Sequence, residues 1–310
     1  MNIQQYAVIG MMAVGVVGAS PKVPASSTHD SGVPAQMVIT VRSTSGGQPA
    51  RLEAQDLTVL EGETRAPVIQ LERLTGDMAD MQLFVLLDDS TRSSSLGIQL
   101  PELKTFLSSL PGTTQVAVGY MRNGSFALAQ AFTSDHQKAA SALRLPMAMA
   151  GENGSPYFAL SSLVDHWPSR QPSGRRAILM LTDGVDRYYS NASLDDPYVS
   201  AAIHKALKEG VMVYSIYLRG AGAYSGNTWV TNVAQSRLIE VSEQTGGYAY
   251  FQGLDDPVTI SPFLKDLQNR FENQYRVTIM ASNAKGLQPV KLRTELPGLS
   301  IYGPNRIYVR

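Results

Sequence analysis

Cysteine is absent from the 310-residue chain, and this absence excludes disulfide bonds, thiolate metal sites and cysteine nucleophiles. Charged residues are few, and the 26 Lys and Arg balance the 26 Asp and Glu, so the formal net charge is zero. Because no run of Lys or Arg breaks this balance, we expect no nucleic-acid partner and no broad attraction to an anionic membrane. The length allows one large domain or two modest ones with a sizeable core.

Motifs of hydrolytic and redox enzymes are also lacking. No G-x-G-x-x-G follows an apolar run, which argues against a dinucleotide site. The four histidines are scattered, and none of them forms H-E-x-x-H or lies beside an obvious nucleophile: His29, His136, His166 and His204. We therefore expect a protein that is not an enzyme.

The N-terminus has the pattern of an export signal. Residues 7–19 (AVIGMMAVGVVGA) form an apolar segment of signal-peptide length, although the preceding MNIQQY has no Lys or Arg. A Ser/Pro-rich stretch follows, and it has too little apolar surface to fold. We predict a signal peptide over residues 1–19, with a wrongly assigned start or an uncleaved anchor as the alternatives, and a linker over residues 20–35. The mature chain would be secreted or periplasmic, and no other segment is long and apolar enough to span a membrane.

Two β-rich segments flank a centre of different character. Residues 36–75 contain VITVR and LTVLEGET, and residues 273–310 contain YRVTIMAS, VKLRTEL and RIYVR. Neither flank has enough strands to form an independent core. We therefore predict that the two flanks pair into one small β module.

The centre, residues 80–272, alternates apolar runs with amphipathic stretches. The runs lack the in/out alternation of a half-exposed strand, so they should be buried on both faces of a parallel sheet. They are Leu83–Leu87, Val116–Met121, Ala177–Leu181 and Val211–Leu218, with a weaker run at Tyr248–Phe251. FALAQAF follows Asn123-Gly124 and is predicted to be an antiparallel edge strand. The pattern indicates a Rossmann-like α/β domain with a doubly wound, mostly parallel sheet.

Polar residues follow two of these runs at the point where each predicted strand ends. In an open parallel sheet, ligands bind beyond the carboxyl ends of the strands. Asp88, Asp89 and Ser90 follow the first run, and Asp183 follows AILML. Ser155 lies in a Gly-rich turn before a predicted helix. We predict that these side chains share one edge of the sheet.

The order of these features resembles a von Willebrand factor type A domain. The resemblance rests on a strand ending in D-x-S, a later turn with Ser before a helix, and the segment RRAILMLTDGVD. The flanking segments, VRSTSGGQPARLEAQDLTVLEGETRAPVIQLERL and FENQYRVTIMASN, are similar to exported bacterial proteins of the VWFA-related Acidobacterial family. The resemblance covers about Gln36 to Arg310.

This resemblance implies a divalent ion, usually Mg²⁺, at the carboxyl edge of the sheet. The implied ligands are Asp88, Ser90, Ser155 and Asp183. Carboxylate and hydroxyl oxygens suit a hard cation, which would retain affinity for a carboxylate of a partner protein. The resemblance thus implies an adhesion-type module that binds an unidentified protein ligand through a metal-ion-dependent adhesion site.

Arg92 departs from the family pattern, because it replaces the last serine of D-x-S-x-S in the register that starts at Asp88. A guanidinium cannot ligate a cation and would repel one held nearby. Two interpretations stay open. In one, Arg92 pairs with Asp88 or Asp183 in a metal-free site. In the other, the motif shifts by one residue and uses Asp89, Thr91 and Ser93.

Other functions remain as alternatives. Asp88 and Asp89 also resemble the acidic pair of a receiver-like or other phosphoryl-transfer domain, and a structural cell-envelope protein is a third class. Four aromatic residues near predicted strand ends are either anchors of a protein interface or packed against neighbouring helices: Tyr188, Tyr189, Tyr224 and Trp229.

Overall fold

The computed structural model describes residues 32–147, 154–171, 173–189, 193, 195–221, 226–282 and 284–310. The predicted signal peptide, most of the predicted linker and Tyr224 lie outside these residues. Strand β1 (Val33–Ser43) begins inside the predicted linker, because Ala35 pairs with Ile279 of a later strand. Within the described ranges, every helix is either too short or too polar to cross a membrane.

A six-stranded sheet forms the centre of the α/β domain, in the order β10-β9-β8-β5-β6-β7. Its strands are β5 (Met81–Asp88), β6 (Thr114–Arg122), β7 (Ser125–Thr133), β8 (Arg176–Thr182), β9 (Val211–Tyr217) and β10 (Ala249–Tyr250). All pairings are parallel except that of β6 with β7. Every residue of β5 is buried, as expected for an apolar run covered on both faces.

The edge of this sheet is made by the hairpin of β6 and β7. Asn123 and Gly124 join the strands, with φ of 51° and 68°. Two successive residues with positive φ match the twist of a tight hairpin, and Asn-Gly is the pair that adopts this turn most readily. The predicted antiparallel edge strand is confirmed.

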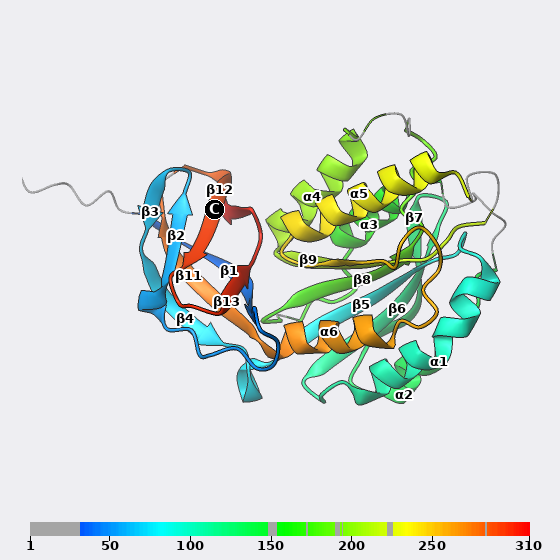
Figure 1. The fold of residues 1–310 in the computed structure, drawn as a ribbon, viewed down its shortest axis with the longest axis horizontal. Coiled ribbons are helices and arrows are strands. Elements are labelled where there is room, and N and C mark those ends of the chain that lie inside the picture. Colours follow the sequence, from blue (N-terminus) through cyan, green and yellow to red (C-terminus); the bar gives the residue numbers. More distant parts are fainter. Residues whose placement is uncertain are drawn as a thin grey trace, which may run out of the picture. The chain divides into compact units, whose positions relative to one another are not determined.

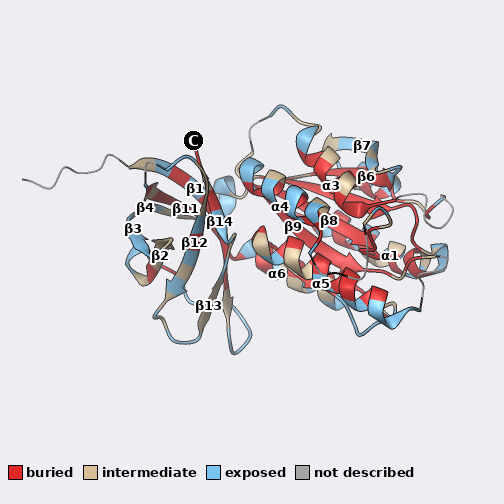
Figure 2. Cartoon of the chain, turned by 90° about the horizontal axis from the view of Figure 1, so that it is seen from above, coloured by how far each residue is buried: buried red, intermediate tan, exposed pale blue. Residues whose placement is uncertain are grey.

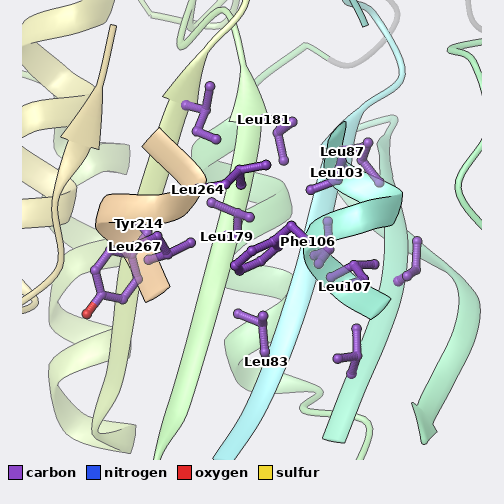
Figure 3. Packing of buried hydrophobic residues seen from close by; sticks show 14 of the residues in the cluster. Leu83, Leu87, Leu103, Phe106, Leu107, Leu179, Leu181, Tyr214, Leu264 and Leu267 are labelled. Carbon is purple, nitrogen blue, oxygen red and sulfur yellow. The ribbon is translucent and has the colours of Figure 1, made fainter. Parts of the chain in front are cut away.

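Helices cover both faces of the sheet (Figure 1). They are α1 (Ser93–Ser109), α2 (His136–Ser141), α3 (Pro156–Asp165), α4 (Pro197–Glu209), α5 (Thr228–Gln244) and α6 (Ser261–Glu272). Phe106 of α1 and Leu264 of α6 belong to the core on one face, together with Leu83 and Leu179 of the sheet, as Figure 3 shows. Leu160 of α3 and Ile203 of α4 belong to the core on the opposite face. The predicted doubly wound, mostly parallel fold is confirmed.

The two flanks of the chain form a β module of two four-stranded antiparallel sheets, ordered β13-β1-β11-β4 and β14-β12-β2-β3. Besides β1, its strands are β2 (Leu57–Glu61), β3 (Thr64–Ala66), β4 (Val68–Arg73), β11 (Gln274–Ala281), β12 (Gly286–Thr294), β13 (Leu299–Tyr302) and β14 (Arg306–Val309). Short 3₁₀ turns lie at Ala54–Asp56 and Gly76–Met78. Apolar residues of both sheets share one core, and Figure 2 shows the buried and exposed positions of these strands. Pairing of β1 with β11 joins the two flanks, as predicted.

Arg175 connects the α/β domain to the β module. Its side chain is buried, and its Nη1 donates to the carbonyl of Phe271 at 2.8 Å and to Oε1 of Gln274 at 2.9 Å. Nη2 donates to the carbonyl of Ala79, just before β5. Burial lowers the pKa of Arg175 to about 10. The guanidinium therefore ties the entry of β5 to the start of β11.

Arg175→Met removes these donors and leaves the oxygens of Phe271 and Gln274 buried without them. We expect the free energy of unfolding to fall by about 2–4 kcal/mol, because hydrogen bonds to charged groups are stronger than neutral ones. Urea denaturation monitored by circular dichroism measures the change. Arg65→Met, at an exposed position of β3, is the matched control. A loss no larger than that of the control would contradict the connecting role of Arg175.

Candidate functional site

Asp88 lies at the end of β5, beside the end of β8, because these neighbouring strands are parallel. Its carboxylate is fully buried and accepts three hydrogen bonds. The N–H and Oγ of Ser90 donate to Oδ1 at 2.9 and 2.6 Å, and Oγ1 of Thr182 donates to Oδ2 at 2.6 Å. The structure thus brings Asp88 and Ser90 together at the predicted edge.

Asp183 follows Thr182 and is also buried. Its Oδ1 accepts from the N–H of Val185 at 2.9 Å, and its Oδ2 lies 2.7 Å from Nη2 of Arg187. Burial raises the pKa of Asp183 to about 6, the guanidinium of Arg187 opposes this shift, and the charge of Asp88 adds to it. Gly220 packs against the same carboxylate so closely that a Cβ there would collide with Oδ2.

Ser155 precedes α3 and points to a carboxylate that the sequence analysis does not assign to the site. Its Oγ donates to Oδ2 of Asp186 at 2.8 Å. Oδ1 of Asp186 accepts from the N–H groups of Tyr188 and Tyr189 at 2.7 and 3.1 Å. Both Ser155 and Asp186 are fully buried. Ser155 therefore fixes the loop after β8.

Asp89 forms an ion pair on the other side of Asp88. Nη1 and Nη2 of Arg144 donate to its two oxygens at 2.8 and 3.1 Å. The N–H of Met147 donates to the same carboxylate at 3.2 Å. The guanidinium of Arg144 also lies 3.8 Å from the ring centroid of Tyr120. Hydrogen bonds from Arg144 to Asp89 raise the pKa of Arg144, so the guanidinium keeps its charge.

Arg92 precedes α1, and its Nε donates to the carbonyl of Gly220 at 3.1 Å. Two arginines that the sequence alone does not point to, Arg187 and Arg144, pair with Asp183 and Asp89 at this edge. The hydroxyls of the shifted motif are also engaged. Oγ1 of Thr91 donates to the carbonyl of Asp88 at 2.9 Å, and Oγ of Ser93 donates to the carbonyl of Pro146 at 3.3 Å.

A divalent ion needs several oxygen ligands that converge on one point. Both oxygens of Asp88 accept hydrogen bonds, Asp183 is paired with Arg187, and the hydroxyl of Ser155 is directed to Asp186. Over the described ranges, no group of three or more His, Asp or Glu side chains could hold a metal. A cation beside Asp183 would also be repelled by the guanidinium of Arg187. This arrangement does not fit a divalent ion.

Sequence reasoning misses Arg187, Asp186 and Arg144. A signal existed for the first two, since both follow the TDG turn within four residues. Arg144 is 55 residues from Asp89, and no local pattern links them. The loop before α3 has to fold back onto the strand end before this pair can form.

The sheet order and the helices on both faces make residues 81–272 a doubly wound, mostly parallel α/β domain. The chain is similar to solved structures that include a von Willebrand factor A domain. No family model and no curated protein matches the chain. Among solved structures, an aerotolerance-related membrane protein from Bacteroides fragilis is 14% identical with a TM-score of 0.43, over 62% of this chain and 98% of that one. BatB from Bacteroides thetaiotaomicron is 14% identical with a TM-score of 0.40, over 61% and 96%. The VWA domain of SpRpn10 is 10% identical with a TM-score of 0.40, over 60% and 94%.

Arg187→Met leaves the carboxylate of Asp183 buried without its cation. We expect the free energy of unfolding to fall by about 3–5 kcal/mol, as for other buried ion pairs that lose one partner. A second substitution, Asp183→Asn, removes the uncompensated charge and should recover most of the loss. Lys205→Met, which breaks the half-exposed pair with Asp165, is the control and should cost less than about 1 kcal/mol. Equal losses of stability in Arg187→Met and in the control Lys205→Met would refute a buried pair at Asp183.

Proposed function

We propose that the chain is a non-enzymatic, exported module that binds a protein partner through the loops at the carboxyl edge of its central sheet. One observation carries this proposal: eight of the twelve exposed large hydrophobic side chains in the described residues lie on or next to these loops. They are Ile98, Leu145, Met147, Tyr188, Trp229, Phe251, Leu254 and Val258. Exposed apolar and aromatic side chains gathered on one face are typical of protein interfaces.

The loops that carry these residues reach the same edge from different parts of the chain. Met147 is held at the end of β5 through its N–H bond to Asp89. Leu145 lies beside Gly97 in the first turns of α1. Trp229 begins α5 and is 60% exposed, and Val258, in the loop before α6, is 82% exposed. An apolar surface assembled in this way suits a folded partner better than a small molecule.

Two carboxylates, the buried Asp186 and the half-buried Asp256, hold these loops in place. Asp186 fixes the main chain at Tyr188 and Tyr189, as described above. Asp256 accepts from the N–H of Arg219 at 2.6 Å and from Oγ of Ser95 at 2.5 Å. A surface that is ordered before binding loses less conformational entropy when the partner arrives. These internal bonds therefore favour recognition by a preformed surface.

The electrostatics of the edge support binding without a metal ion. Arg187 and Arg144 neutralise two of the buried carboxylates from within the chain. Phosphoryl transfer is less well supported, because Asp88 and Asp89 are 0% and 1% exposed and both accept hydrogen bonds from the chain itself. The apolar N-terminal segment supports export to the periplasm or the cell exterior.

Metal independence can be tested by thermal unfolding. We expect Mg²⁺, Mn²⁺ and EDTA to leave the Tm of the wild-type protein unchanged. Arg187→Ser leaves the carboxylate of Asp183 without its guanidinium partner and therefore free to bind Mg²⁺. Because a ligand that binds only the folded state stabilises that state, Mg²⁺ should raise the Tm of this variant. The double variant Arg187→Ser/Asp183→Asn should show no response. A rise in the wild-type Tm with Mg²⁺ would contradict the proposal of a metal-free site.

Partner binding can be tested by capture from a cell-envelope fraction, with and without chelator. The triple variant Met147→Ser/Tyr188→Ser/Trp229→Ser should lose the captured protein, because anchor residues at an interface contribute about 2–4 kcal/mol each. Ile69→Ser/Leu128→Ser, at exposed positions of β4 and β7, is the matched control and should retain it. Identification is by mass spectrometry, and affinity is measured with the purified partner. If the control variant loses the captured protein, or the triple variant retains it, the interface lies elsewhere.

A further inference from the structure

The first strand of the β module is paired unequally on its two sides. β1 pairs with β11 along residues 33–40, but with β13 only from Thr40 to Ser43. Among the strands that the structure describes, residues 33–39 therefore have a partner on one side only. An open strand edge presents main-chain donors and acceptors to whatever lies next to it.

The register shows which main-chain groups face the open side. The N–H of Val41 donates to the carbonyl of Asn273, which continues the ladder with β11, and the N–H of Thr44 donates to the carbonyl of Gly298 on the β13 side. Main-chain groups alternate in direction along an antiparallel strand, so odd-numbered residues face β11 and even-numbered residues face the other side. The N–H and C=O groups of Gln36 and Val38 thus point to the open side of β1.

The course of the chain after β13 explains why this side is open. β13 ends at Tyr302, and Gly303 packs against Ile39 and Leu292 too closely to admit a Cβ. Pro304 then forms a bridge with Thr245 at the end of α5, and the N–H of Asn305 donates to the carbonyl of Gln244 at 3.2 Å. The chain leaves β1 at the point where β13 would otherwise continue beside Val38.

A cleft of about 360 Å³ lies along this open edge. It is lined by residues 34–38 of β1 and by residues 206–212, which span the end of α4, the turn at Gly210 and the start of β9. Residues 245, 304, 306–308 and 310 complete the lining. This volume falls within the range of about 300–1,000 Å³ found for ligand sites. Three basic side chains, those of Lys208, Arg306 and Arg310, line it with one acidic side chain, that of Glu209. The ion pairs formed among the described residues use none of these three basic side chains.

We propose that this cleft binds an extended, acidic peptide segment of a partner protein, which adds to β1 as a strand. The main-chain groups of Gln36 and Val38 match an extended backbone, and strand addition to an open edge is a recurring mode of peptide recognition. Lys208 and Arg306 select acidic side chains on the peptide. Pro34 is consistent with this assignment, because proline in a strand is confined to positions where no N–H is needed for the ladder.

Gln36→Pro tests the proposal without disturbing the pairing of β1 with β11, since the N–H of Gln36 faces away from β11. The probe is a fluorescent acidic peptide, EVTVEVT, with blocked ends, and binding is measured by anisotropy. We expect Gln36→Pro to weaken binding at least about tenfold, the equivalent of about 1.4 kcal/mol. Arg73→Pro is the matched control, because its N–H faces the open edge of β4 on the far side of the same sheet. This variant should bind the peptide as the wild type does.

Hydrogen exchange gives an independent measurement. In the free protein, the amides of Gln36 and Val38 should exchange faster than those of Met37 and Ile39, and the peptide should slow the first pair. Slow exchange at Gln36 and Val38 in the free protein would overturn the proposal, because another part of the chain would then occupy the edge. Failure of the wild type to bind the probe, or equal binding by Gln36→Pro, would also overturn it. Equal affinity for the basic peptide KVTVKVT would overturn the assignment of an acidic partner.

Discussion

The burial of carboxylates at one edge of the central sheet is the constraint on which the rest of the site depends. Parallel strands end at the same edge, so Asp88, Asp89, Asp183 and Asp186 come together with at most 3% exposure each. Buried charges are costly unless hydrogen bonds or opposite charges compensate them. Here hydroxyl groups, main-chain amides and the guanidinium groups of Arg144 and Arg187 supply that compensation.

This compensation has a structural consequence, because most of the groups that donate hydrogen bonds to these carboxylates come from loops; Thr182, at the end of β8, is the exception. Arg144 draws the segment before α3 to the end of β5, and Asp186 fixes the main chain after β8. Replacing such pairs by apolar residues often leaves stability unchanged or raises it, so their presence is weak evidence for a role in stability. Their effect here is geometric. They hold the loops in one arrangement and leave apolar side chains on the outside, which is the surface that a protein partner would meet.

The sequence predicts the sheet well and the site only in part, for a physical reason. Apolar runs such as Leu83–Leu87 are long and local, so they reveal both the strands and the parallel sheet. The position of Asp88 and Asp183 at strand ends follows from the same pattern. The pairing of Asp89 with Arg144 depends on how a distant loop folds back, and the direction of the Ser155 hydroxyl depends on Asp186. Neither contact leaves a periodic or short-range signal.

The open edge of β1 shows how one chain can expose a strand without becoming prone to aggregation. A fully exposed edge would pair with the edge of another sheet, which proteins usually prevent by charge, proline or cover. Here the turn between α4 and β9 and the segment from Pro304 to Tyr308 form the walls of the cleft beside the edge. A single extended segment can enter such a cleft, whereas the edge of a second sheet brings further strands and their helices, which these walls exclude. The same walls that block sheet-to-sheet pairing therefore leave β1 available for one peptide strand.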